Sequence, residues 1–74
     1  MANALQDQFA EVLLDRIRQD TYPSGTQMDI FESFASPRMR LEFALHLMDR
    51  IQLDTYPSIP MIQRVQRLIA EFGR

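Results

Sequence analysis

Apolar side chains return every three or four residues in four stretches of the chain, which is the spacing of an amphipathic helix. The pattern predicts helices over about 3–19, 25–35, 37–53 and 59–72. In the third stretch the apolar positions cover an arc of roughly 200° when each residue advances the helix by about 100°. We therefore expect 37–53 to be the central helix, in contact with more than one neighbour.

Three of the five methionines fall on faces that the pattern predicts to be buried, namely Met28, Met48 and Met61. Methionine has a flexible side chain that fills irregular gaps in a core. We expect these residues to fill the core rather than to line an adaptable binding groove.

The same five residues, Asp-Thr-Tyr-Pro-Ser, stand at 20–24 and at 54–58, between predicted helices. Proline cannot continue a helix, and serine can cap the helix that follows. Ser24 with Gln27 three residues later has the pattern of a capping box, and Ser36 before a proline marks a further helix start. Each tyrosine is expected to lie over a hairpin end with its ring buried and its hydroxyl in water.

These connections belong to a longer internal repeat. When 5–35 is placed on 39–69, an offset of 34 residues, 11 of 31 positions are identical without a gap. Short connections between helices favour antiparallel neighbours. The sequence therefore predicts an all-α protein, with one compact four-helix domain over residues 1–74 made of two antiparallel helical hairpins that are related by the repeat.

A chain of 74 residues lies near the lower limit at which one core stabilises a fold. It has no cysteine, which excludes disulfides and thiolate chemistry and favours the cytoplasm. No apolar run approaches the roughly 20 residues of a membrane-spanning helix, and the first residues carry no secretory pattern. We expect a cytoplasmic protein that does not enter a membrane.

The net charge of −2 is unevenly divided, with −4 on residues 1–36 and +2 on residues 37–74. The attraction between these halves favours either docking of one hairpin on the other or head-to-tail docking of two chains. All eight basic residues are arginine, which is typical of a GC-rich coding sequence such as that of a high-GC bacterium or its phage.

Few residues are candidates for catalysis or metal binding. His46 is the only histidine and falls on the polar side of its helix with Glu42 and Asp49, where we expect a solvated surface residue. Serines and threonines stand at caps and turns, and two glycines do not form a phosphate-binding loop. We expect no enzymatic activity, no cofactor and no metal site.

The apolar arcs of 3–19 and 37–53 are wider than four helices can cover, which leaves Leu5, Val12 and Leu53 as exposed anchors. Tyrosine and arginine are enriched at interface hot spots. We expect a small non-enzymatic helical protein-protein interaction module, of phage or accessory-gene origin, that forms homo-oligomers or binds another protein. Its candidate interface residues are Leu5, Val12, Arg16, Tyr22, Arg50, Leu53 and Tyr56.

Two alternatives remain open. In the first, the protein is a DNA-binding regulator with 59–72 as its recognition helix, whose polar side chains reach bases and phosphates. These candidate nucleic-acid contacts are Gln63, Arg64, Gln66 and Arg67. The acidic net charge, together with Asp29 and Glu32 in the equivalent helix of the first repeat, favours the interaction module. In the second, an inhibitor covers another protein with the acidic residues of its first half, which are Asp7, Glu11, Asp15, Asp29 and Glu32.

Overall fold

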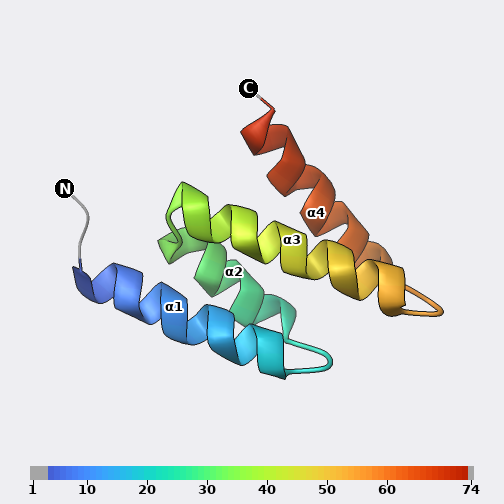
Figure 1. Cartoon of the computed structure of the whole chain (residues 1–74), viewed down its shortest axis with the longest axis horizontal. Coiled ribbons are helices and arrows are strands. Elements are labelled where there is room, and N and C mark those ends of the chain that lie inside the picture. Colours follow the sequence, from blue (N-terminus) through green and yellow to red (C-terminus); the bar gives the residue numbers. More distant parts are fainter. Residues whose placement is uncertain (1–3, 74) are drawn as a thin grey trace. The chain divides into compact units, whose positions relative to one another are not determined.

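The computed structural model describes residues 4–73, and these fold into α-helices without a strand (Figure 1). In chain order the helices are α1 (Ala4–Gln19), α2 (Gly25–Phe34), α3 (Pro37–Leu53) and α4 (Ile59–Phe72). The all-helical prediction is confirmed, and the third and fourth helices have the predicted bounds. The second helix ends one residue early, because Ala35 has extended backbone angles of φ −72° and ψ 140°. Asn3, the predicted first residue of α1, lies outside the described residues.

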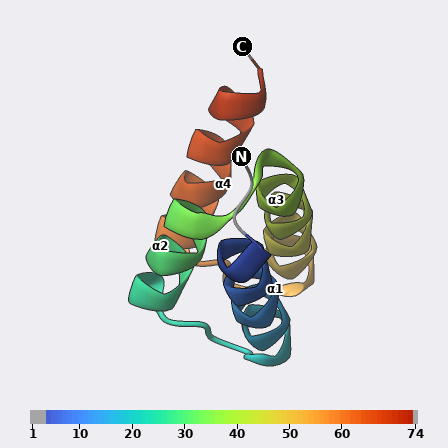
Figure 2. The same ribbon diagram turned by 90° about the vertical axis from the view of Figure 1, so that its left-hand side faces the viewer.

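The chain divides into two compact units, one up to Arg40 and one from Leu41. In the first unit, α1 and α2 pack side by side as a helical hairpin (Figure 2). In the second unit, α4 follows the main part of α3 after a five-residue connection and runs at an angle to it (Figure 1). The four helices fit two hairpins, as predicted, whereas a single domain over residues 1–74 stays a prediction.

Both helices of the first unit contribute buried side chains. Ala10, Leu14 and Ile17 are buried on α1 at the spacing of one helical face, and Met28 and Phe31 are buried on α2. Since α1 and α2 are in contact, these apolar faces form the centre of the first hairpin.

An aromatic pair joins α1 to α2 at the edge of this core. The rings of Phe9 and Phe34 meet edge to face, with centroids 5.1 Å apart and planes at 84°. Such a pair stabilises the packing by about 1 kcal/mol beyond the area that it buries. Both rings are also partly open to solvent, so the contact lies at the rim of the hairpin.

In the second unit, α3 and α4 contribute equally to the buried set. Its members are Phe43, Ala44 and Leu47 from α3, and Met61, Val65 and Leu68 from α4. Phe72 lies one turn beyond Leu68 on the same helical face but is exposed, at the last residue of α4. The expectation of buried methionines holds for Met28 and Met61 and is wrong for Met48, which is exposed.

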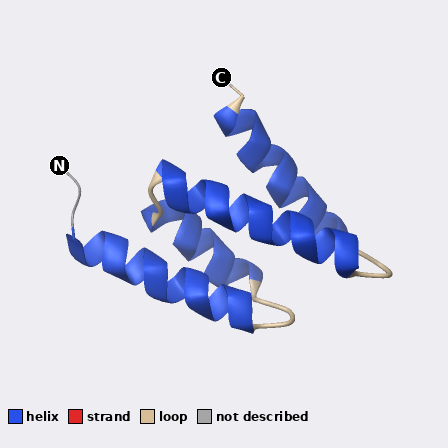
Figure 3. Ribbon diagram, viewed as in Figure 1, coloured by secondary structure: helices blue, strands red, loops and turns tan. Residues whose placement is uncertain are grey.

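The two five-residue connections, drawn as loops in Figure 3, have the same hydrogen bonds. Ser24 Oγ accepts the backbone N–H of Gln27 at 3.0 Å, and Ser58 Oγ accepts that of Met61 at 3.3 Å. Both serines have extended backbone angles, so each caps the helix that follows. The capping predicted at Ser24 is confirmed, and the repeated residues have a repeated local structure here.

A third serine cap begins α3, and an arginine ties this helix start to the end of α2. Ser36 Oγ accepts the backbone N–H of Met39 at 3.3 Å. One turn along α3, Arg40 Nη1 donates to the carbonyl of Glu32 at 2.7 Å. This carbonyl belongs to the last turn of α2, where carbonyls lack partners within the helix and a cation is favoured by the helix dipole. The bond therefore holds the first turn of α3 against α2.

Burial does not follow the repeat in the same register. Phe9 is exposed whereas its counterpart Phe43 is buried, and Leu14 is buried whereas its counterpart Met48 is exposed. The helices that precede the two identical connections, α1 and α3, thus bury partly different faces, although Ala10 and its counterpart Ala44 are both buried. The relation of the two whole hairpins by the repeat stays a prediction.

Replacing either capping serine should destabilise the fold. We expect Ser24→Ala and Ser58→Ala each to lower the free energy of unfolding by about 1 kcal/mol, because one helical N–H loses its partner. Urea denaturation followed by circular dichroism measures this change. Ser33→Ala is the matched control, because the exposed Ser33 hydroxyl donates to the Ile30 carbonyl at 2.7 Å within its own helix, a bond that adds little stability. Equal losses in all three variants would contradict the capping role.

Candidate interaction surface

A row of exposed side chains runs along one flank of α1. Leu5 is 75% exposed and Val12 59% exposed, with the exposed part of Phe9 between them. Their spacing of four and then three residues places them along one line of the helix. Arg16 continues this line by one turn, and 68% of its side chain is exposed. We call Leu5, Phe9, Val12 and Arg16 the α1 row.

Phe9 extends this apolar surface from α1 onto α2. Its ring contacts that of Phe34, and Ile30 lies one turn before Phe34 on the same helix face. Phe34 and Ile30 are both exposed. The α1 row is therefore the edge of an apolar patch that crosses both helices of the first unit.

The side chain of Arg16 forms a weak ion pair with Asp20. Its Nε atom lies 3.5 Å from Oδ1 of Asp20, which is the ion pair that the four-residue spacing allows. Because the arginine side chain is mostly exposed, such a pair contributes only tenths of a kcal/mol and exchanges readily with another carboxylate. Its counterpart in the repeat, Arg50, is partly buried, so the two arginines differ in their access to a partner.

A second row of exposed side chains runs along α3. Leu41 is 47% exposed and Leu45 51% exposed, and both Met48 and Gln52 are exposed as well. We call Leu41, Leu45, Met48 and Gln52 the α3 row. The wide apolar arc of this helix was expected to be covered by several neighbours, and for these residues that expectation is wrong.

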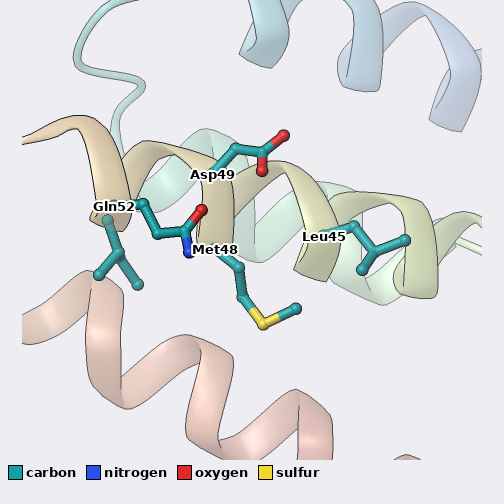
Figure 4. A pocket seen from close by; sticks show the side chains of 5 residues that line it. Leu45, Met48, Asp49 and Gln52 are labelled. Carbon is teal, nitrogen blue, oxygen red and sulfur yellow. The ribbon is translucent and has the colours of Figure 1, made fainter.

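A hollow of about 590 Å³ opens beside the α3 row. It is lined by Leu45, Met48, Asp49, Ile51 and Gln52. Figure 4 shows Met48 extending to the side on which α4 is drawn and Asp49 extending to the opposite side. The hollow thus has an apolar floor with one acidic residue at its rim.

Both tyrosines of the repeated connections are fully accessible. Tyr22 is 86% exposed and Tyr56 is 91% exposed. The expectation that their rings are buried is wrong, because they lie in the middle of a connection, beyond the helix ends that would have to cover them. Leu53, the last residue of α3, is 78% exposed, as expected of an anchor.

The candidate nucleic-acid contacts lie on a mixed face of α4. Gln63, Gln66 and Arg67 are exposed, whereas Arg64 is partly buried. Exposed isoleucines stand among them on the same helix, at positions Ile59, Ile62 and Ile69. The apolar stripe predicted for α4 is therefore only partly covered, and its surface alternates between amide, arginine and isoleucine.

His46 and Glu42 are partly buried rather than fully solvated. Among residues 4–73 no three histidine, cysteine, aspartate or glutamate side chains come close enough to hold a metal ion. In the same part of the chain, no helix has the length and apolar character needed to cross a membrane.

The structure gathers three of the predicted interface residues, Leu5, Val12 and Arg16, in the α1 row. The α3 row was missed by sequence reasoning. Its signal is visible in the repeat, where two acidic residues of the first copy are replaced by Leu41 and Leu45. This replacement shows that the second copy is more apolar at these positions, but not whether a neighbour covers them. Comparisons with protein-family models, curated proteins and solved structures found no match for this chain.

Truncating the buried Leu47 and the exposed Leu53 should change the free energy of unfolding by different amounts. We expect Leu47→Ala to cost about 2–5 kcal/mol of unfolding free energy, because Leu47 is buried and leaves a cavity. Leu53→Ala should change it by less than about 0.5 kcal/mol. Urea denaturation at low protein concentration, where association does not contribute, measures both. A large loss for Leu53→Ala would show that this residue belongs to the core.

Proposed function

We propose that this protein is a small non-enzymatic interaction module that self-associates through apolar side chains exposed on its helices. The observation that carries the proposal is the α1 row, in which Leu5 and Val12 stay exposed although α1 packs against α2. Contiguous apolar surface on a small protein marks an interaction site. The apolar patch around Phe9 gives this surface both area and an aromatic anchor.

The residue chemistry supports a protein partner more than a nucleic acid. Isoleucines interrupt the polar face of α4, and Arg64 is partly buried, so few cations there reach a phosphate backbone. The chain as a whole carries a net charge of −2. Binding by protein-protein contact requires no excess of positive charge.

Several finer features fit this role. The internal repeat would make the protein a pair of related hairpins in one domain, each ending in an exposed tyrosine that is suited to the rim of an interface. A chain without cysteine suits the cytoplasm. We extend the same proposal to a phage or accessory-gene origin, which the all-arginine basic residues support.

A charge placed in the α1 row should weaken self-association. We expect Val12→Glu to raise the dissociation constant by about tenfold or more, because the interface would have to bury a carboxylate, and to leave the helix content unchanged. Light scattering over a concentration series, with circular dichroism on the same samples, measures both quantities.

The control is Gln8→Glu, an added charge at an exposed position outside the α1 row. It should associate as the unmodified chain does. A protein that is monomeric at every concentration would overturn the proposal. So would a Val12→Glu variant that loses its helices at concentrations where the unmodified chain is a folded monomer, because Val12 would then be part of the core.

A further inference from the structure

We infer that the hollow beside the α3 row receives the α1 row of a second copy of this chain. This inference rests on the proposed self-association and names the surfaces that meet. It is carried by three observations: the matching spacing of the two rows, the apolar lining of the hollow, and a pair of opposite charges at corresponding places.

The two rows have the same spacing. Exposed residues stand at 5, 9, 12 and 16 on α1 and at 41, 45, 48 and 52 on α3, with steps of four, three and four residues in both. At 1.5 Å per residue, the seven steps from Phe9 to Arg16 cover about 10 Å, as do the seven steps from Leu45 to Gln52 along the hollow. The part of the α1 row from Phe9 to Arg16 therefore has the length of the hollow that it would fill, and Leu5 lies level with Leu41 beyond it.

The residue chemistry agrees when the two helices run in the same direction. In that register Leu5 is level with Leu41, Phe9 with Leu45 and Val12 with Met48. Anchors spaced by four and three residues are the usual way in which an amphipathic helix occupies an apolar groove. Methionine at the centre of the groove adapts its shape to an aromatic or branched side chain.

Opposite charges then meet at one end of the contact. Arg16 is level with Gln52, and long helical side chains lean toward the helix N-terminus, which brings the guanidinium toward Asp49. Asp49 is the one acidic residue among those that line the hollow, and it is exposed. Among residues 4–73, Arg16 has a weak, exposed pair with Asp20 to give up. The net charge is −4 on residues 1–36 and +2 on residues 37–74. This difference also favours a contact between the first half of one chain and the second half of the other.

A two-fold symmetric dimer makes this contact twice. The α1 row of each copy enters the α3 hollow of the other, so both rows of both chains are covered and the assembly closes.

Charge reversal with recombination tests the inference. In the variants Arg16→Asp and Asp49→Arg, like charges meet at both contacts of a homodimer, and we expect each dissociation constant to rise on the order of tenfold or more. In an equimolar mixture of the two variants, one contact of a heterodimer joins the two substituted side chains, which are opposite in charge. The other contact joins the unmodified Arg16 and Asp49, so both contacts are attractive. The mixture, and the double variant alone, should dimerise about as well as the unmodified chain.

Arg18→Asp and Asp15→Arg are the matched controls for the charge changes, since both alter exposed positions of α1 outside the α1 row. Leu45→Glu tests the floor of the hollow, with Ile59→Glu on α4 as its control. Leu45→Glu should abolish the dimer and Ile59→Glu should leave it intact. Sedimentation velocity gives the masses, and circular dichroism confirms that each variant is folded.

The outcomes separate this inference from the proposed function. A dimer that forms normally in Arg16→Asp, Asp49→Arg and Leu45→Glu would overturn the inference and leave self-association standing on another surface. Recovery in the double variant without recovery in the mixture would overturn it as well, because the charge pair would then lie within one chain. An unmodified chain that is monomeric throughout would overturn both.

Discussion

A helix in a two-helix hairpin can turn only one face toward its partner, and this limit determines the surface of the protein. α1 buries Ala10, Leu14 and Ile17, whereas Leu5 and Val12 lie on a flank well away from that face. No rotation of α1 buries both sets against α2 alone. The exposed apolar row therefore follows from apolar residues on more than one face of the helix and not from loose packing. α3 has the same excess, because Leu41 and Leu45 stay exposed while Phe43 and Leu47 are buried.

The connections determine where helices begin and end but leave this choice of face open. Ser24 and Ser58 cap their helices with the same hydrogen bond, and the backbone N–H groups of Asp20 and Asp54 donate to the carbonyls of Arg16 and Arg50 at 3.1 and 3.0 Å. These interactions are local and specify a helix boundary whatever lies beyond it. The rotation of each helix about its axis depends instead on which apolar face finds a neighbour.

The sequence predicted where helices begin and end, but it did not predict which face of each helix is buried. The bounds of α3 and α4 were predictable because serine and proline act within a few residues of themselves. The exposure of Leu45 and Met48 was not, because a wide apolar arc shows that a helix has surface to spare without showing which side a neighbour covers. The exposure of Tyr22 was not predictable either. Its amphipathic ring suits a partly buried site, but no neighbouring side chains cover it in the connection. The exposure of Leu5 and Val12 was predictable because α1 has more apolar positions than a single partner can cover.

In the proposed dimer, self-association and folding stability are coupled. A small domain buries a modest share of its apolar surface, so its core supplies little excess stability. When a second copy binds only the folded chain, the folded state gains free energy that grows with protein concentration. Leu5 and Val12 would then stabilise the fold without being in the core of the monomer, through surface that the dimer removes from water. The α1 row costs free energy in the isolated chain because it exposes apolar surface to water. In the proposed dimer the same row both forms the interface and stabilises the folded state.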